Sequence, residues 1–173
     1  VPYSKIGAAD EPEPWTTEKN KAIARLVTQK SIVLLKNSKN LLPLDKTKLK
    51  SIAVIGARAN EVLADWYSGD PPYVVTPLDG IRDKVGPNVV VNCATNNENG
   101  AAVKLARSAD VAIVCVGNHP NGGYDMPWEK VSLPSEGREA VDRKSITLED
   151  EALIKEVFAA NPRTIVVLIS SFP

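Results

Sequence analysis

Histidine and cysteine are scarce in this sequence of 173 residues, which holds one histidine and two cysteines. His119 alone cannot build a metal site that needs several histidines. Cys93 and Cys115 lie in or at the end of predicted core strands, where free thiols behave as small apolar side chains. Two cysteines do not make a disulfide framework, so they leave the redox compartment open.

The sequence also lacks an excess of charge, a membrane-length apolar run and a nucleotide-binding loop. Lysine plus arginine and aspartate plus glutamate each number 21, which gives zero net charge, unlike the basic excess of nucleic-acid binders. No apolar run approaches the ~20 residues of a membrane span. Gly56-Ala-Arg-Ala-Asn60 supplies a single glycine where a dinucleotide fingerprint needs G-x-G-x-x-G, and no Walker-type loop is present. A flavodoxin-like nucleotide or receiver domain is therefore a remote alternative.

Short apolar strands alternate with helices along most of the chain. Helix starts are marked by Thr16 or Thr17, by the capping pattern Thr76-Pro-Leu-Asp79 and by the similar pattern Thr147-Leu-Glu-Asp150. The first helix carries an apolar face of Ile23, Leu26 and Val27. We expect strands at 51–56, 88–92, 110–116 and 164–170, helices at 76–86, 100–108 and 147–160, and short extended pieces at 31–36 and 40–44.

This alternation predicts an α/β sandwich, in which helices cover both faces of a mostly parallel sheet. Right-handed crossovers place Gly56, Ala94, Gly117 and Ser170 along one edge of that sheet. Ligands of open α/β sheets bind at this carboxyl edge. The strand at 164–170 is strongly apolar and would lie at an open edge, so we expect further strands in a longer parent protein.

Two aromatic-rich loops and one charged stretch are expected at the same edge. Trp66 and Tyr67 follow the first strand, whereas His119 and Trp128 follow the third. Aromatic rings pack on the apolar faces of sugars, and carboxylates accept hydroxyl protons, although the rings could instead pin their loops to the core. The segment 117–146 is too long for a plain connection.

Residues 135–143, within that segment, hold three carboxylates and two arginines. A carboxylate beside a fixed cation can have its pKa set for proton transfer. The alternative is a solvated charged loop without a chemical role.

Several segments in order resemble the second domain of glycoside hydrolase family 3, the family of β-glucosidases, β-xylosidases and exo-glucanases. Each segment is weak alone, but their order along nearly the whole chain is specific. The segments are Ser31-Ile-Val-Leu-Leu-Lys-Asn37, Leu41-Leu-Pro-Leu44, Ile52-Ala-Val-Ile-Gly56, Tyr67-Ser-Gly69, Val75-Thr-Pro-Leu-Asp-Gly-Ile81, Ala109-Asp-Val-Ala-Ile-Val-Cys-Val-Gly117, Glu139-Ala-Val-Asp-Arg143 and Ala160-Asn-Pro-Arg-Thr-Ile-Val-Val-Leu168.

The resemblance implies a six-stranded α/β sandwich domain behind a β/α-barrel domain, with the active site between them. Residues 1–15 would then be the linker from the absent barrel, and residues 16–173 the sandwich domain, truncated at its C-terminal end. The barrel would supply an aspartate nucleophile and the sandwich domain the general acid/base of retaining hydrolysis. Asp65-Trp66 looks like part of the nucleophile motif, but it lies in the Tyr-Ser-Gly loop, so we do not assign it that role.

The family pattern singles out Glu139 as first choice for the acid/base, because in many members a glutamate stands three residues before an Asp-Arg pair. Asp142 and Arg143 would hold that loop and tune the carboxylate, and Glu136 is the second choice. Residue 140 is alanine where many relatives have glycine. Asn118 occupies the place at which plant exo-hydrolases carry their acid/base, and an amide cannot donate that proton.

The implied function is half of the active site of an exo-acting retaining β-glycosidase that hydrolyses β-glucosides or β-xylosides. Trp66, Tyr67, His119 and Trp128 would line the sugar site, with no metal and no cofactor. Without the nucleophile the fragment should be inactive. The alternative is a non-catalytic carbohydrate-binding or domain-assembly module. The partners are the substrate and the barrel domain, without nucleic acid or membrane, and the resemblance slightly favours a secreted or periplasmic enzyme.

Overall fold

The computed structural model describes residues 13–63, 71–117, 148 and 150–170. The chain divides into two compact units, Val1–Leu42 and Pro43–Pro173. The sheet and three of the helices belong to the second unit.

The first unit holds α1 (Glu18–Ser31), which begins where the sequence predicts. Thr17 is its N-cap and accepts a hydrogen bond from the backbone N–H of Asn20. Its predicted apolar face is exposed on the described chain, at 50% for Ile23, 54% for Leu26 and 62% for Val27. After α1 the backbone is extended at Ile32, no strand forms among the described residues of this unit, and a 3-10 turn follows at Ser38–Asn40.

The second unit is built on a sheet of four parallel strands in the order β2-β1-β3-β4. The strands are β1 (Ser51–Ile55), β2 (Val90–Ala94), β3 (Val111–Val116) and β4 (Thr164–Leu168). Three helices connect them, α2 (Pro77–Val85), α3 (Ala101–Ser108) and α4 (Glu151–Ala160). The predicted α/β class is confirmed.

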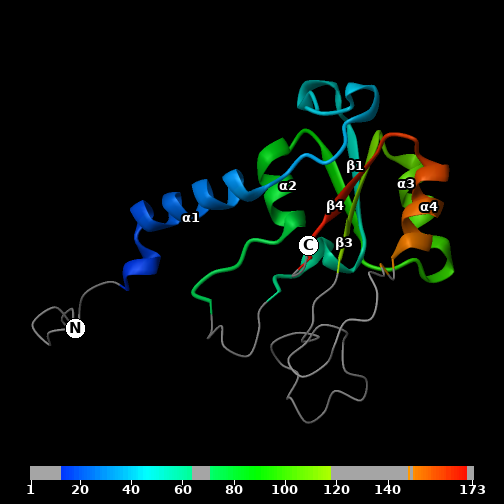
Figure 1. Ribbon diagram of the computed structural model, residues 1–173. Coiled ribbons are helices and arrows are strands. Elements are labelled where there is room, and N and C mark those ends of the chain that lie inside the picture. The colour runs from blue at the N-terminus through cyan, green and yellow to red at the C-terminus, as the bar shows by residue number, and fades with distance from the viewer. Residues whose placement is uncertain (1–12, 64–70, 118–147, 149, 171–173) are drawn as a thin grey trace, which may run out of the picture. The chain divides into compact units, whose positions relative to one another are not determined.

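Side chains alternate between the two faces of the central strands and produce two cores. Ile52 and Val54 of β1 point to a cluster that includes Leu78 of α2. Ala53 and Ile55 point the other way, to a cluster formed with α3 and α4. Figure 1 shows α2 on one side of the sheet and α3 with α4 on the other. All six residues of β3 are buried, which explains its uninterrupted apolar sequence.

The boundaries of three predicted elements are wrong. The last strand ends at Leu168 rather than at residue 170. The second strand lies two residues later than the predicted 88–92, because pairing with β1 sets Ser51 against Val90 and Ile55 against Ala94. The last helix begins at Glu151 rather than at Thr147, and its N-cap Asp150 makes no side-chain capping bond.

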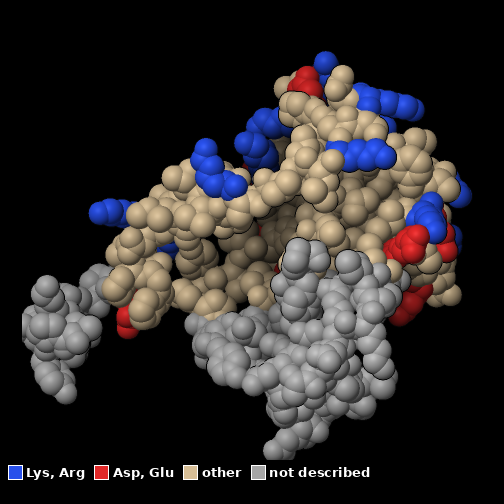
Figure 2. Space-filling model, viewed as in Figure 1, with Lys and Arg blue, Asp and Glu red and all other residues tan. Residues whose placement is uncertain are grey.

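Charged side chains are spread over the surface of the described residues. Figure 2 shows lysine and arginine at several separate places on the visible face, with aspartate and glutamate between them. None of the helices among the described residues combines the length and apolar character that a membrane span requires.

Candidate functional site at the carboxyl edge of the sheet

The carboxyl ends of the four strands meet at one edge, as the predicted crossovers require. The N–H of Gly56 donates to the carbonyl of Ala94 at 2.9 Å, which joins the ends of β1 and β2. The N–H of Ile169 donates to the carbonyl of Val116 at 2.8 Å, which joins the ends of β3 and β4. Chain segments that leave β1 and β3 therefore start side by side, since these two strands are paired neighbours.

Two glycines at this edge allow backbone to pass very close to backbone. Gly56 has φ +104° and Gly117 has φ +148°, values that L-residues with a side chain rarely adopt. A Cβ at Gly56 would overlap the carbonyl of Cys115, and one at Gly117 would overlap the backbone of Ile169. The directions in which the chain leaves β1 and β3 are therefore set by backbone contacts that only glycine permits.

Arg58 connects the ends of β1 and β3. It lies in a 3-10 turn at Ala57–Asn60, directly after Gly56, and its Nε donates to the carbonyl of Gly117 at 3.2 Å. Its Nη1 forms an ion pair with Glu61, and the arginine side chain is only 22% exposed. A guanidinium suits this place because its planar array of donors can serve a carbonyl and a carboxylate at once.

The far end of the segment after β1 is fixed by the cap of α2. The Thr76 hydroxyl accepts from the Asp79 N–H at 3.1 Å, and the Asp79 carboxylate accepts from the Thr76 N–H at 3.3 Å, which together form the predicted capping box. The Thr76 hydroxyl also donates to the Asp79 carboxylate at 2.7 Å. The hydroxyl and then the N–H of Thr76 hold the pKa of the Asp79 carboxyl below its ordinary value. Oδ1 of Asn60 lies 3.3 Å from the same hydroxyl. Both ends of the segment 61–75 are thus anchored to each other.

All the site residues predicted from the sequence lie outside the described residues. The loop after β1 holds Trp66 and Tyr67, and the segment after β3 holds His119, Trp128, Glu136, Glu139, Asp142 and Arg143. What the structure supplies is the place from which these two segments leave the sheet, at Gly56 and Gly117. Arg58 and Glu61 were not among the predicted site residues. The signal that could have found them is an Arg and a Glu just beyond the strand-ending Gly56.

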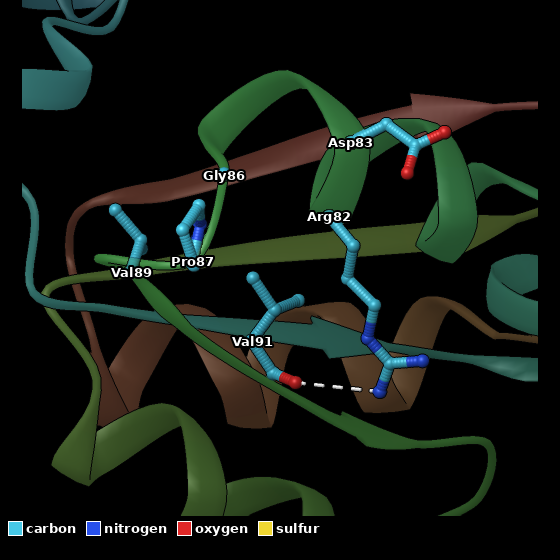
Figure 3. Close-up of a pocket in the computed structure, with 6 residues that line it drawn as sticks. All are labelled: Arg82, Asp83, Gly86, Pro87, Val89 and Val91. Carbon is cyan, nitrogen blue, oxygen red and sulfur yellow. Dashed lines mark hydrogen bonds between the residues drawn. The ribbon is translucent and has the colours of Figure 1, made fainter.

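Two cavities lie among the described residues away from this edge. One has a volume of about 500 Å³ and lies beyond the end of α2. In Figure 3 Arg82 reaches from α2 toward the carbonyl of Val91, to which it donates at 3.4 Å, while Asp83 points away. The other, about 540 Å³, lies between α2 and the Leu44–Leu49 segment. Neither contains a residue of the carboxyl edge, and the described residues hold no cluster of His, Cys, Asp and Glu suited to a metal.

Comparison with protein families gives a match over most of the chain. The family model described as "Glycosyl hydrolase family 3 C-terminal domain" covers residues 32–173. This range contains the whole sheet and all residues of the carboxyl edge.

Curated relatives are enzymes of much greater length. A protein named beta-xylosidase from Formosa agariphila is 33% identical over 174 residues, which cover 91% of this chain and 22% of that protein. Beta-D-xylosidase 3 from Arabidopsis thaliana is 32% identical, with 92% of this chain and 20% of the relative covered. A probable beta-glucosidase L from Aspergillus terreus is 35% identical, with 87% and 22% covered. The chain spans about a fifth of the length of these relatives.

Solved structures share the fold. A beta-D-glucoside glucohydrolase from Trichoderma reesei matches with a TM-score of 0.68 and 29% identity, over 88% of this chain and 23% of that structure. The beta-glucosidase D2-BGL from Chaetomella raphigera matches with a TM-score of 0.70 and 28% identity, over 94% of this chain and 24% of that structure.

Proposed function

The chain belongs to the family of glycosyl hydrolase family 3 C-terminal domains, and from this premise we propose that it supplies one half of the active site of a retaining, exo-acting β-glycosidase. The family match over residues 32–173 carries the proposal. The relatives named as β-xylosidases and β-glucosidases support hydrolysis of β-glucosides or β-xylosides as the reaction. The remaining length of those relatives leaves room for an upstream β/α-barrel that holds the nucleophile.

The proposed chemistry needs two carboxyl groups on opposite sides of the glycosidic bond. An aspartate of the barrel attacks the anomeric carbon and forms a glycosyl-enzyme intermediate, while the acid/base protonates the departing oxygen. The same acid/base then removes a proton from water, which attacks the anomeric carbon and releases the sugar. We assign the acid/base role to Glu139 and hold Glu136 as the second choice.

The geometry of the carboxyl edge supports this division of roles. The segment with Trp66 and Tyr67 leaves from β1, and the segment with His119, Trp128 and Glu139 leaves from the neighbouring β3. Two segments that start from paired strands can reach a common ligand, as is usual at this edge of open α/β sheets. Asp142 and Arg143 are proposed to hold and tune Glu139, and the aromatic residues and His119 to contact the sugar.

Replacement of Glu139 tests the assignment in the full-length parent enzyme. Glu139→Ala should lower kcat on an alkyl β-glycoside, whose leaving group needs protonation, by about 10²–10⁴-fold. Turnover of a dinitrophenyl β-glycoside, whose leaving group departs without a proton, should be spared in the step that forms the glycosyl-enzyme. Initial-burst and steady-state rates on both substrates separate formation of the glycosyl-enzyme from its hydrolysis.

Glu136→Ala and Glu129→Ala are the matched controls, since both glutamates lie in the same segment. If only Glu136→Ala loses kcat on the alkyl glycoside, the acid/base role belongs to Glu136, the second choice. Wild-type behaviour of all three variants would contradict a proton donor in this segment and favour the non-catalytic module. In the same assay the 173-residue chain alone should show no turnover, because it lacks the proposed nucleophile.

A further inference from the structure

Cationic residues outnumber carboxylates at the amino edge of the sheet, where the four strands begin. This edge consists of the residues that lead into the strands and of the last turns of the helices before them, at 43–51, 82–90, 105–111 and 157–164. Its seven cationic residues are all exposed, and they are Lys46, Lys48, Lys50, Arg82, Lys84, Arg107 and Arg163. Its three carboxylates are Asp45, Asp83 and Asp110.

The carboxyl edge has the opposite balance of charge. Its described segments at 56–63, 71–80, 95–104 and 150–154 hold five carboxylates and two cationic residues. The sequence as a whole has zero net charge, so the two edges of the sheet differ in sign while the total cancels.

Two of the three carboxylates at the amino edge are already bound. Asp45 accepts from the N–H of Thr47 at 3.0 Å and forms an ion pair with Lys48 at 3.3 Å. Asp110 accepts from the N–H groups of Lys50 and Ser51. In the described part of the chain four of the cationic residues form no ion pair, namely Lys46, Lys50, Lys84 and Arg163.

These four cations are spread along the edge at positions that the backbone fixes. Lys50 precedes β1 and Arg163 precedes β4, two strand spacings away, so their backbones lie about 10 Å apart. Nζ of Lys46 lies 3.5 Å from the carbonyl of Lys84, at the end of α2. A cation at a helix C-terminus offsets the helix dipole, which accounts for Lys84 but not for Lys50 and Arg163, which lie in no helix. Such a row of charges suits an extended polyanion better than one small anion.

We propose that the amino edge of the sheet binds an acidic polysaccharide, a polymer of uronic acids, and thereby holds the enzyme on a charged glycan. The choice of a polysaccharide rests on the proposed function, because the carboxylates along sugar chains belong to uronic acid units. Zero net charge gives the chain no overall attraction to nucleic acid. Strands of five or six residues separate the two edges by about 17–20 Å, so a polymer bound at the amino edge leaves the carboxyl edge free.

The test uses the full-length parent enzyme with polygalacturonate as the probe. Lys50→Gln with Lys84→Gln removes two charges, and the bonds printed for these residues involve only their backbone atoms. Lys104→Gln with Lys155→Gln is the matched control, since both lysines are exposed and lie outside the four segments of the amino edge. Titration calorimetry measures binding at low and at physiological salt, with duplex DNA and a neutral glucan as further ligands. Each protein is also assayed on a dinitrophenyl β-glycoside, with and without polygalacturonate, and its Tm is measured.

We expect the wild-type enzyme to bind polygalacturonate at low salt, more tightly than DNA or the glucan, and to lose affinity as salt screens the charges. Lys50→Gln with Lys84→Gln should weaken this binding by about fivefold or more, and glutamate at both positions should weaken it further. The control pair should change it by less than about twofold. Turnover of the small glycoside should be the same in all these proteins and unaffected by the polymer, because the two edges are separate.

The proposal is wrong if polygalacturonate does not bind at low salt, if the control pair loses as much affinity, or if DNA binds at least as tightly. Inhibition of turnover by the polymer, equal in wild type and in both lysine pairs, would place the polymer at the carboxyl edge instead. Binding without hydrolysis of any β-glycoside would contradict only the proposed function, whereas hydrolysis without binding would contradict only the role of the amino edge.

Discussion

Asp110 shows how one side chain joins two strands at the amino edge of the sheet. Its carboxylate accepts hydrogen bonds from the backbone N–H of Lys50 at 2.7 Å and of Ser51 at 2.9 Å. The Ser51 hydroxyl in return accepts from the Asp110 N–H at 3.1 Å. These bonds, the one from Lys50 first, hold the pKa of the Asp110 carboxyl below its ordinary value. The starts of β1 and β3 are thus tied by a charged group.

Asp110→Asn should make the stability of the chain less dependent on pH. A carboxyl whose pKa is lowered by folding stabilises the folded state above its unfolded pKa, about 4 for aspartate, and loses that contribution as the pH falls through the folded value. The wild-type advantage in free energy of unfolding should therefore be full at neutral pH and shrink as the pH falls below about 4. Urea denaturation from neutral to acid pH measures it, with the exposed Asp83→Asn as control. If the difference in free energy of unfolding between wild type and Asp110→Asn stays constant over that pH range, the charge of Asp110 does not stabilise the fold.

Predictions for single residues were confirmed where the neighbouring sequence determines whether a side chain is buried. Cys115 is a buried free thiol as predicted, and burial raises its pKa to about 11. Cys93 is free and only partly buried. Asn161 directly follows the predicted end of the last helix, at residue 160. Its side chain also donates to the carbonyls of Ala106 at 2.9 Å and Ala109 at 2.8 Å, which ties the end of α4 to α3. Those partners are distant in the sequence, so no local pattern could indicate them.

At the scale of elements, local capping chemistry predicted the helix starts at Thr17 and Thr76 and failed at a third. The box at Thr76 and Asp79 forms as expected, with Pro77 in the first turn. The similar pattern at Thr147 did not set the start of α4, which begins at Glu151. The Thr76 pattern has proline at the first helical position, whose fixed φ favours the helix there. The Thr147 pattern has leucine at that position instead of proline, and a single capping bond of about 1 kcal/mol does not decide a boundary.

The close approach of Gly117 to the backbone of Ile169, at the end of β3, allows a test at the scale of elements. Gly117→Ala would need φ +148° and would push a methyl group into the backbone of Ile169. We expect a loss of at least about 2 kcal/mol in the free energy of unfolding, since both backbone strain and overpacking contribute. Gly86→Ala is the matched control, because Gly86 has φ +76° but open space around it. Its loss should be about 1 kcal/mol, from strain alone.

Urea denaturation of the two variants separates strain from overlap. Equal losses at Gly117 and Gly86 would show that β4 moves aside without cost. That result would contradict the view that the carboxyl edge has a fixed geometry.

At the scale of the whole molecule, the fold was predictable because it repeats one unit. Apolar strands of similar length alternate with amphipathic helices, and right-handed crossovers then leave few topologies. Strand register was less predictable: β2 lies at Val90–Ala94 because of its pairing with β1, whereas apolar character begins earlier in the sequence. The two cores on opposite faces follow from the alternation of side chains along β1.

The edge at which the two candidate segments leave the sheet was predictable, whereas the site itself stays a proposal. Parallel strands put ligand sites at their carboxyl ends, and the structure brings the exits of β1 and β3 together there. The contact of Arg58 with Gly117 was not predictable, because the two residues are 59 positions apart. The candidates Glu139, Glu136, Trp66 and Trp128 were chosen from residue type and family resemblance, and they remain proposals. In the proposed function the nucleophile belongs to a further domain, so the geometry of the proposed site would depend on both domains.

Azide rescue of the Glu139→Ala parent enzyme tests the central claim most directly, namely that this domain supplies the acid/base of a retaining glycosidase. With a dinitrophenyl β-glycoside the variant should form the glycosyl-enzyme but release it slowly, since no base activates water. Azide needs no base, so its addition should raise turnover by about tenfold or more and give a β-glycosyl azide. An unchanged rate and no glycosyl azide with Glu139→Ala, and equally with Glu136→Ala and Glu129→Ala, would contradict the account.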